Sequence, residues 1–578
     1  MNKIIYRCCY LLCFVLLFTS QSCKKEKIDT VLDNRTLTEN RANSNARIIN
    51  LAGFNQVIAN GDSLTNFVVR NPVGPDSYKF PGTSYFPTDG KLGKIWNIPQ
   101  DLFNAQNVAK LNFTTRLYQN TLLTDLKLDA KNDYANPTDY FLMPAVFMNG
   151  QPDAVIPIKR GVSAPSKPDH FKIRIVNLSG EIKTKGSNSS GALEDLTGSV
   201  SLAYSDGTLV DAKTNHISSQ QRASEYIELP YGTYQFKVLM EDGRQMASMG
   251  SEAYEFTVID PSTSTIPESL TKSTALTYAP IQTYQPGGIY TILIAPQSFK
   301  YLINEIGETT DTYQNSFQII SDNSAAVNNT YFRLQTVNAW QSEKVSFRIG
   351  GKTIANNLDF GNIGDYANFV HGIHTVEALD ASGKVIATVQ QELRAAQNYT
   401  AWLYPDQLGA VKLILVANDL SGTNAIQGLQ DDATFARTQQ KFFFFKRFLN
   451  FSTDNPFITF TLSNGQPLAG VSNNTQVGVN MQPGIPLMER PFAISSYAQT
   501  PFELMAYRSR PNVVPGIWAD DIPVVKNDTF IANKILYTQA KRPLPVQEAG
   551  IYTVALIGKT TGSTATTSAR MIIIKHNK

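Results

Sequence analysis

Residues 365–376 read DYANFVHGIHTV, a strand pattern that carries a tyrosine, then a glycine and a second strand pattern. The same arrangement occurs at residues 225–238, which read EYIELPYGTYQFKV. β-Branched and aromatic side chains alternate with polar ones in both stretches, as is typical of strands. A glycine permits the tight reversal between adjacent antiparallel strands. The two stretches therefore predict strand–turn–strand units.

A degenerate repeat surrounds these stretches. Each is preceded by a strand that ends in asparagine, at residues 171–177 and 331–338. Aromatic-centred strands close the repeat units at residues 288–294, 398–404 and 549–556. Aromatic side chains at alternate positions fill the space between two packed sheets. We therefore predict an all-β fold built of tandem antiparallel β-sandwich domains.

The chain of 578 residues is too long for a single core and divides into six predicted segments. Residues 24–44 are polar with alternating charges, which is typical of a flexible tether. A short helix is expected at residues 99–109. The predicted segments are a leader at 1–22, a tether at 23–44, and β-sandwich units at 45–160 (with an insertion), 168–300, 328–420 and 441–578.

All four cysteines lie in the first 23 residues: Cys8, Cys9, Cys13 and Cys23. Lys3 and Arg7 precede an apolar run at residues 10–18, which is too short to span a membrane. Small polar residues follow it at 19–22. This order of a basic, an apolar and a small polar region predicts a signal peptide.

The residues before Cys23 resemble the lipobox of bacterial lipoproteins, with a small residue, Ser22, directly before the cysteine. Ser20 stands where that family usually has an aliphatic residue. The resemblance implies cleavage before Cys23, a diacylglycerol on its thiol and an acylated N-terminus. Two or three acyl chains make membrane attachment durable. The alternative is ordinary secretion, which would leave Cys23 as a reactive thiol.

The absence of Asp after Cys23 implies, by the same resemblance, sorting to the outer membrane. The lipid anchor would make the membrane a partner of the chain. Whether the chain faces the medium or the periplasm stays open.

Residues 331–419 resemble a family of bacterial extracytoplasmic β-sandwich repeats that is catalogued only as a domain of unknown function. The shared features are Arg333 and Asn338 in the first strand, a hairpin at residues 349–352 and the tyrosine strand. His371 stands where the family more often has proline. The resemblance implies tandem immunoglobulin-like sandwiches on envelope lipoproteins, with no established catalytic residues.

The sequence carries no recognised catalytic motif, and we predict no enzyme activity, no metal and no cofactor. His371 and His374 form one H-x-x-H motif. On a helix this spacing could hold zinc, but the flanking residues indicate a strand, so the two histidines are better explained as residues of a turn. Acidic pairs at 241–242, 431–432 and 520–521 are expected in solvated turns, with calcium near Asp520 as the alternative. A hydrolase in the first or last unit is a further alternative, which only their weak match to the repeat suggests.

Aromatic side chains offer the best candidates for ligand contact. Trp96 and Trp518 lie in Gly- and Pro-rich surroundings and are predicted to be exposed for carbohydrate stacking, whereas Trp402 is expected in a core. Residues 442–445 are four consecutive phenylalanines, interpreted as a strand buried on both faces, with an exposed partner contact as the alternative.

The net charge is only +3 and no basic stripe exists, so nucleic acid is not expected as a partner. The sequence thus favours a lipid-anchored cell-envelope protein that acts as a non-catalytic binding or structural spacer array. A glycan or an envelope protein is the expected partner. The alternative is a glycan-binding accessory lipoprotein of an outer-membrane polysaccharide uptake system.

Overall fold

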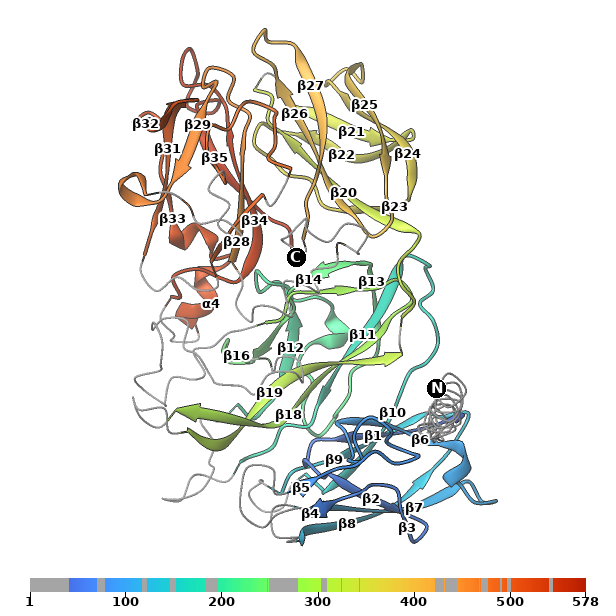
Figure 1. Cartoon of the computed structure of the whole chain (residues 1–578). Coiled ribbons are helices and arrows are strands. Elements are labelled where there is room, and N and C mark those ends of the chain that lie inside the picture. The colour runs from blue at the N-terminus through green and yellow to red at the C-terminus, as the bar shows by residue number, and fades with distance from the viewer. Residues whose placement is uncertain are drawn as a thin grey trace, which may run out of the picture. The chain divides into compact units, whose positions relative to one another are not determined.

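The fold is almost entirely β, and its described part forms two compact bodies, β1–β10 and β11–β35 (Figure 1). The predicted fold class of tandem β-sandwiches is confirmed. The computed structural model describes residues 41–69, 78–116, 122–145, 152–182, 196–246, 248, 279–302, 309–323, 325–341, 344–420, 431, 444–466, 468, 477–488, 491–495, 501–539 and 544–578.

The first body is one sandwich, with sheets in the orders β10-β9-β1-β6 and β3-β2-β7-β8. Its elements are β1 (Asn43–Asn50), β2 (Gln56–Ala59), β3 (Asp62–Ser63), β4 (Val68–Val69), β5 (Tyr78–Lys79), β6 (Ile95–Pro99), the 3-10 turn η1 (Gln100–Leu102), β7 (Val108–Arg116), β8 (Leu122–Lys131), β9 (Thr138–Leu142) and β10 (Val155–Lys159).

The helix predicted at residues 99–109 is wrong. Only η1 forms there, and β7 follows it. The side chain of Asn104 accepts hydrogen bonds from the backbone N–H groups of Gln106 and Val108. These local bonds replace the backbone pattern of a helix, as is common for asparagine.

The second sandwich opens the second body, with main sheets in the orders β13-β11-β18-β19 and β12-β15-β16 and a separate pair β14-β17. The hairpin of its last two strands extends past the end that we predicted at residue 300. Its elements are β11 (His170–Asn177), β12 (Val200–Ala203), η4 (Ala212–Thr214), β13 (Ile227–Pro230), β14 (Gly232–Tyr234), β15 (Lys237–Met240), β16 (Gln245–Met246), β17 (Gln282–Tyr284), β18 (Ile289–Leu302) and β19 (Thr309–Asn323).

The third sandwich pairs the sheets β23-β20-β26-β27 and β22-β21-β24-β25. The hairpin at residues 349–352 joins β21 to β22 through Gly350 and Gly351, which both have positive φ. Its strands are β20 (Tyr331–Asn338), β21 (Val345–Ile349), β22 (Lys352–Leu358), β23 (Ala367–Val370), β24 (Gly372–Leu379), β25 (Val385–Leu393), β26 (Asn398–Pro405) and β27 (Val411–Ala417).

The fourth sandwich pairs the sheets β30-β28-β34-β35 and β29-β31-β32, with β33 beside β31. Its elements are β28 (Phe444–Asn450), β29 (Ile458–Thr461), η6 (Ser463–Gly465), β30 (Phe492–Ser495), β31 (Glu503–Arg510), β32 (Val513–Trp518), β33 (Val525–Lys526), η8 (Asn527–Phe530), α4 (Lys534–Gln539), β34 (Gly550–Ile557) and β35 (Arg570–Lys575).

One pairing scheme recurs in all four sandwiches. The first strand lies between an antiparallel neighbour and the closing strand, and it runs parallel to the closing strand. The parallel pairs are β1 with β9, β11 with β18, β20 with β26, and β28 with β34. The closing strand then pairs antiparallel with the strand that follows it. The sequence repeat therefore corresponds to a repeat of topology, in which one strand pair of each sandwich is parallel.

The asparagine at the end of each first strand has a structural role. Asn50, Asn177, Asn338 and Asn450 are all buried. The Nδ2 of Asn177 donates to the carbonyls of Gly198 and Ile217, and the other three asparagines also donate to backbone carbonyls. Each side chain satisfies buried backbone groups that would otherwise lack partners.

Residues 365–376 do not form a hairpin. β23 belongs to one sheet of the third sandwich and β24 to the other, so the chain crosses between sheets at His371 and Gly372. Gly372 has a φ of 144°, which side-chain-bearing residues rarely adopt. The predicted reversal between adjacent strands is therefore wrong, and the glycine marks a bend at a sandwich corner.

Three apolar clusters join the sandwiches of the second body. Trp402 of β26 stacks on Phe451 of the fourth sandwich, with ring centroids 4.6 Å apart. Phe445 packs against residues of the second and third sandwiches, including Ile281 and Leu420. Leu536 of α4 packs against Ala203 and Leu239 of the second sandwich. The first and closing strands of the third and fourth sandwiches are thus buried on both faces, which explains their nearly continuous apolar character.

This packing explains the phenylalanine run where it is described. Phe444 lies in the core of the fourth sandwich and Phe445 in the cluster between sandwiches. Burial on both faces is therefore the correct interpretation for these two residues. Phe442 and Phe443 lie outside the described residues.

A buried ion pair also joins the second and fourth sandwiches. The Nζ of Lys237 on β15 lies 2.8 Å from Oε1 of Glu548, and both side chains are buried. Glu548 also accepts hydrogen bonds from Tyr537 and from the backbone of Ala532. Burial alone would raise the pKa of Glu548, but the charges of Lys237 and Lys575 lower it to about 2.

Candidate binding pocket between three sandwiches

The two candidate tryptophans have different environments. Trp96 is only 7% exposed and packs against Phe86 in the core of the first sandwich. The predicted exposure of Trp96 is wrong, because the alternation of β6 turns Ile95 outward and Trp96 inward. Trp518, at the end of edge strand β32, is 48% exposed and follows Ile517, which is 78% exposed.

The prediction for Cys23 concerns residues outside the described part of the chain, as do the leader and most of the tether. Among the described residues, no helix is both long enough and apolar enough to cross a membrane.

The H-x-x-H residues belong to the bend between β23 and β24. The ring of His374 hydrogen-bonds to the carbonyl of Val370 at 2.8 Å and packs against Phe332. No group of three potential metal ligands occurs within the described ranges. Asp242 and Asp521 pair with Arg244 and Arg508, respectively. Asp431 is buried and accepts a hydrogen bond from Nδ2 of Asn398, so the solvated turn predicted there is wrong.

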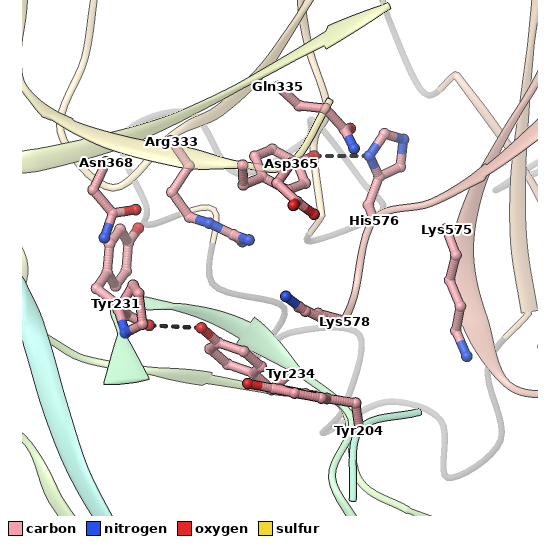
Figure 2. A pocket seen from close by; sticks show the side chains of 12 residues that line it. Tyr204, Tyr231, Tyr234, Arg333, Gln335, Asp365, Asn368, Lys575, His576 and Lys578 are labelled. Atoms are coloured by element: carbon pink, nitrogen blue, oxygen red, sulfur yellow. Dashed lines mark hydrogen bonds between the residues drawn. The ribbon is translucent and has the colours of Figure 1, made fainter. Parts of the chain in front are cut away.

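A cavity of about 210 Å³ lies where the second, third and fourth sandwiches meet (Figure 2). We call it the junction pocket. All its walls belong to the second compact body. It is lined by Tyr204, Pro230, Tyr231, Tyr234, Arg333, Gln335, Asp365, Tyr366, Asn368, Lys575, His576 and Lys578.

Arg333 projects into the junction pocket from β20. Its Nη1 donates to Oδ1 of Asn398 at 3.2 Å, and its guanidinium lies 4.1 Å from the ring centre of Tyr366. The residue is 4% exposed, and its Nε has no hydrogen-bond partner in the described structure. Gly232 makes room for it, since a Cβ there would lie 3.2 Å from Cζ of Arg333.

Gln335 lies two residues along the same strand, so its side chain points to the same side as that of Arg333. It is 6% exposed, and its Oε1 has no hydrogen-bond partner among the described residues. In the parallel pairing, Gln335 stands opposite Thr400. Two residues of the pocket lining, both on β20, thus carry a buried donor and a buried acceptor that have no hydrogen-bond partner among the described residues.

The other three sandwiches have arginine at the position of Gln335. Arg174 and Arg447 stand opposite Thr291 and Thr553, and the Nε of each arginine donates to the threonine hydroxyl. Arg47 pairs in the same way with Asp139. The third sandwich therefore departs from the repeat, with its arginine two residues earlier and at the pocket.

Tyr366 and His576 form the buried side of the pocket. The Tyr366 hydroxyl and Nδ1 of His576 hydrogen-bond at 2.8 Å, and Nε2 of His576 bonds with the hydroxyl of Thr553. Burial, aided by the charges of Arg447 and Arg333, holds the pKa of His576 well below its usual value. Burial also raises the pKa of Tyr366 to about 12. Both groups are therefore neutral at pH 7.

The pKa of His576 predicts how stability depends on pH. Below pH 6.5 the unfolded chain binds a proton at His576 that the folded protein excludes, so the free energy of unfolding falls as the pH drops. The slope from this group approaches about 1.4 kcal/mol per pH unit. Urea unfolding at pH 7.5 to 5 should show a shallower slope for His576→Gln than for the wild type. Equal slopes for the two proteins would contradict this assignment.

Tyrosines and lysines form the rest of the wall. Tyr234 is buried, and its hydroxyl donates to the carbonyl of Pro230. The Nζ of Lys578 lies 4.9 Å from the ring centre of Tyr204. Lys575 lies 3.6 Å from Glu548, and burial lowers its pKa to about 8. Figure 2 shows the charged ends of Arg333, Lys578 and Asp365 directed toward the same space.

Comparisons with known proteins add little to this geometry. No protein-family model and no curated protein matches the chain. One solved structure comes from work on alpha-glucan recognition by family 41 carbohydrate-binding modules of streptococcal virulence factors. It is 9% identical and covers 43% of this chain and 97% of its own, with a TM-score of 0.13. A score this low carries no argument about function.

Proposed function

We propose that the chain is a non-catalytic binding protein of the bacterial outer membrane, anchored by acyl chains on Cys23, which binds a saccharide-sized polar ligand in the junction pocket. The anchor holds one end of the chain at the membrane, and the second body carries the pocket. The proposal for the anchor depends on the lipobox resemblance, and the proposal for binding depends on the pocket.

The observation that carries the binding proposal is the pair of unsatisfied atoms, Nε of Arg333 and Oε1 of Gln335. Buried polar atoms are nearly always hydrogen-bonded, and leaving one without a partner costs about 1–3 kcal/mol. A ligand that offers both an acceptor and a donor relieves both costs. Aromatic walls beside a few polar groups are typical of small-ligand sites.

Saturation-transfer NMR with a panel of neutral and acidic mono- and oligosaccharides tests this proposal. The full chain purified in detergent should transfer saturation to at least one saccharide. Gln335→Leu removes the unpartnered acceptor and should abolish the transfer. The matched control Gln390→Leu, on exposed strand β25, should retain it. Absence of transfer across the panel, or an unchanged signal in Gln335→Leu, contradicts the proposal.

The exposure of Trp518 favours a second candidate, a glycan-binding accessory protein of a polysaccharide uptake system. Exposed tryptophan faces stack on sugar rings. If this surface binds polysaccharide, Trp518→Ala should abolish retardation of the protein in polysaccharide affinity gels. Unchanged migration of wild-type protein across a broad panel of polysaccharides would contradict this candidate.

The same substitution at the other tryptophan tests stability instead of binding. Because Trp96 is in the core, Trp96→Ala should lower the free energy of unfolding of the first sandwich by about 3–5 kcal/mol. Thermal unfolding monitored by circular dichroism measures this loss. A change below about 1 kcal/mol would contradict the burial of Trp96.

A further inference from the structure

We propose that the ligand of the junction pocket is a polyhydroxylated carboxylic acid the size of one acidic sugar residue. Its carboxylate accepts from Arg333, and one of its hydroxyls donates to Gln335. This inference rests on the proposed function, because it names the class of ligand for the same site.

Arg333 brings a buried positive charge to the junction pocket. Its guanidinium is almost wholly buried, and its polar contact within the described structure is the neutral amide of Asn398. A buried charge without a counter-ion is costly. The ring of Tyr366 offsets part of that cost through a cation–π contact. A ligand carboxylate supplies the missing negative charge and suits the planar geometry of arginine.

The other charged groups at the pocket do not form an ion pair with Arg333. Lys575 is already engaged by Glu548, and His576 is neutral. Lys578 and Asp365 are exposed residues at the rim. Arg333 makes no ion pair with Asp365, and the buried carboxylate of Asp431 is hydrogen-bonded to Asn398 instead, so Arg333 has no direct carboxylate partner among the described residues. The pocket therefore favours an anion over a neutral or cationic ligand.

The acceptor Oε1 of Gln335 calls for a hydrogen-bond donor on the ligand. A carboxylate cannot donate to it, so an anion without a hydroxyl would leave this buried oxygen unsatisfied. Asp365 is a second acceptor on the same pocket wall. The donor and acceptor together therefore select a molecule that has both a carboxylate and hydroxyl groups.

The size and shape of the junction pocket also limit the ligand. A volume of about 210 Å³ is below the roughly 300–1,000 Å³ of pockets for drug-sized ligands. Tyr231 and Tyr234 provide aromatic side chains against which the apolar face of a sugar ring packs. One sugar residue matches these limits better than a chain of several residues.

Isothermal titration with galacturonate and galactose tests the inference, since the two sugars differ in a carboxylate at one carbon. The full chain in detergent should bind galacturonate about 30-fold more tightly than galactose. Inorganic phosphate should bind more weakly than galacturonate, because it cannot pack against the tyrosines. Arg333→Gln should remove the preference for the acid, and the matched control Arg348→Gln, whose side chain pairs with Glu377 on the other sheet, should keep it.

The outcomes separate this inference from the proposed function. Equal affinity for the two sugars overturns the inference and leaves saccharide binding standing. Binding of neither sugar, with no other saccharide bound, overturns both. If phosphate binds more tightly than galacturonate, the inference of a sugar acid is overturned and the ligand is a phosphate. If Arg333→Gln does not fold, the comparison of galacturonate with galactose on the wild-type protein still tests the inference.

Discussion

Replacing Glu548 by Ala is expected to lower the free energy of unfolding of the second body by about 3–5 kcal/mol. The substitution leaves Lys237 buried between the second and fourth sandwiches without its partner, and it removes an acceptor from Tyr537. Breaking one side of a buried ion pair costs this much because the remaining charge is uncompensated. Urea unfolding followed by circular dichroism measures the loss.

The control for this experiment is a more exposed ion pair in the same body. Glu377→Ala removes the partner of Arg348 and should cost about 0–1 kcal/mol. A loss below about 1 kcal/mol in Glu548→Ala would contradict the structural role of the buried pair.

The same carboxylate should make stability sensitive to acid. The pKa of Glu548 is about 2 in the folded protein, against an ordinary value of 4.5. The contribution of this carboxylate to the free energy of unfolding is therefore complete above pH 4.5 and is lost as the pH falls from there toward 2. The difference in unfolding free energy between wild type and Glu548→Ala should shrink over that range.

Cys23→Ala is expected to release the protein from the membrane fraction completely. The substitution removes the thiol that would carry the diacylglycerol, and durable attachment needs two or more acyl chains. Cys13→Ala, inside the predicted leader, is the matched control and should leave the protein in membranes. Membrane fractionation followed by immunodetection measures the distribution.

Protease shaving of intact cells determines which side of the outer membrane the anchored protein faces. Cleavage of the wild-type protein would place it on the cell surface, and protection would place it in the periplasm. Retention of Cys23→Ala in membranes would contradict the anchor.

The repeat and the fold class could be predicted from the sequence because they depend on local patterns. The asparagine that ends each first strand was visible, and the structure explains it through hydrogen bonds to backbone carbonyls. Strand partners were harder to predict. The bend at Gly372 has the same sequence pattern as a hairpin, although its two strands belong to different sheets.

The junction pocket could not be predicted because its walls come from residues 204 to 578 of three sandwiches. Spacing along the chain does not show how sandwiches pack against one another. One signal was present in the sequence: Arg47, Arg174 and Arg447 each stand three residues before the final asparagine, whereas the third unit has Gln335 there. That departure marks the strand that supplies the unsatisfied Nε of Arg333 and Oε1 of Gln335.

A crystal structure of the protein soaked with galacturonate tests the central claim, that the junction pocket is a ligand site, most directly. The account predicts one sugar residue in the pocket, with its carboxylate within hydrogen-bond distance of Nε of Arg333 and a hydroxyl on Oε1 of Gln335. A pocket that holds only water at saturating galacturonate, or a sugar seated at Trp518 instead, would contradict it.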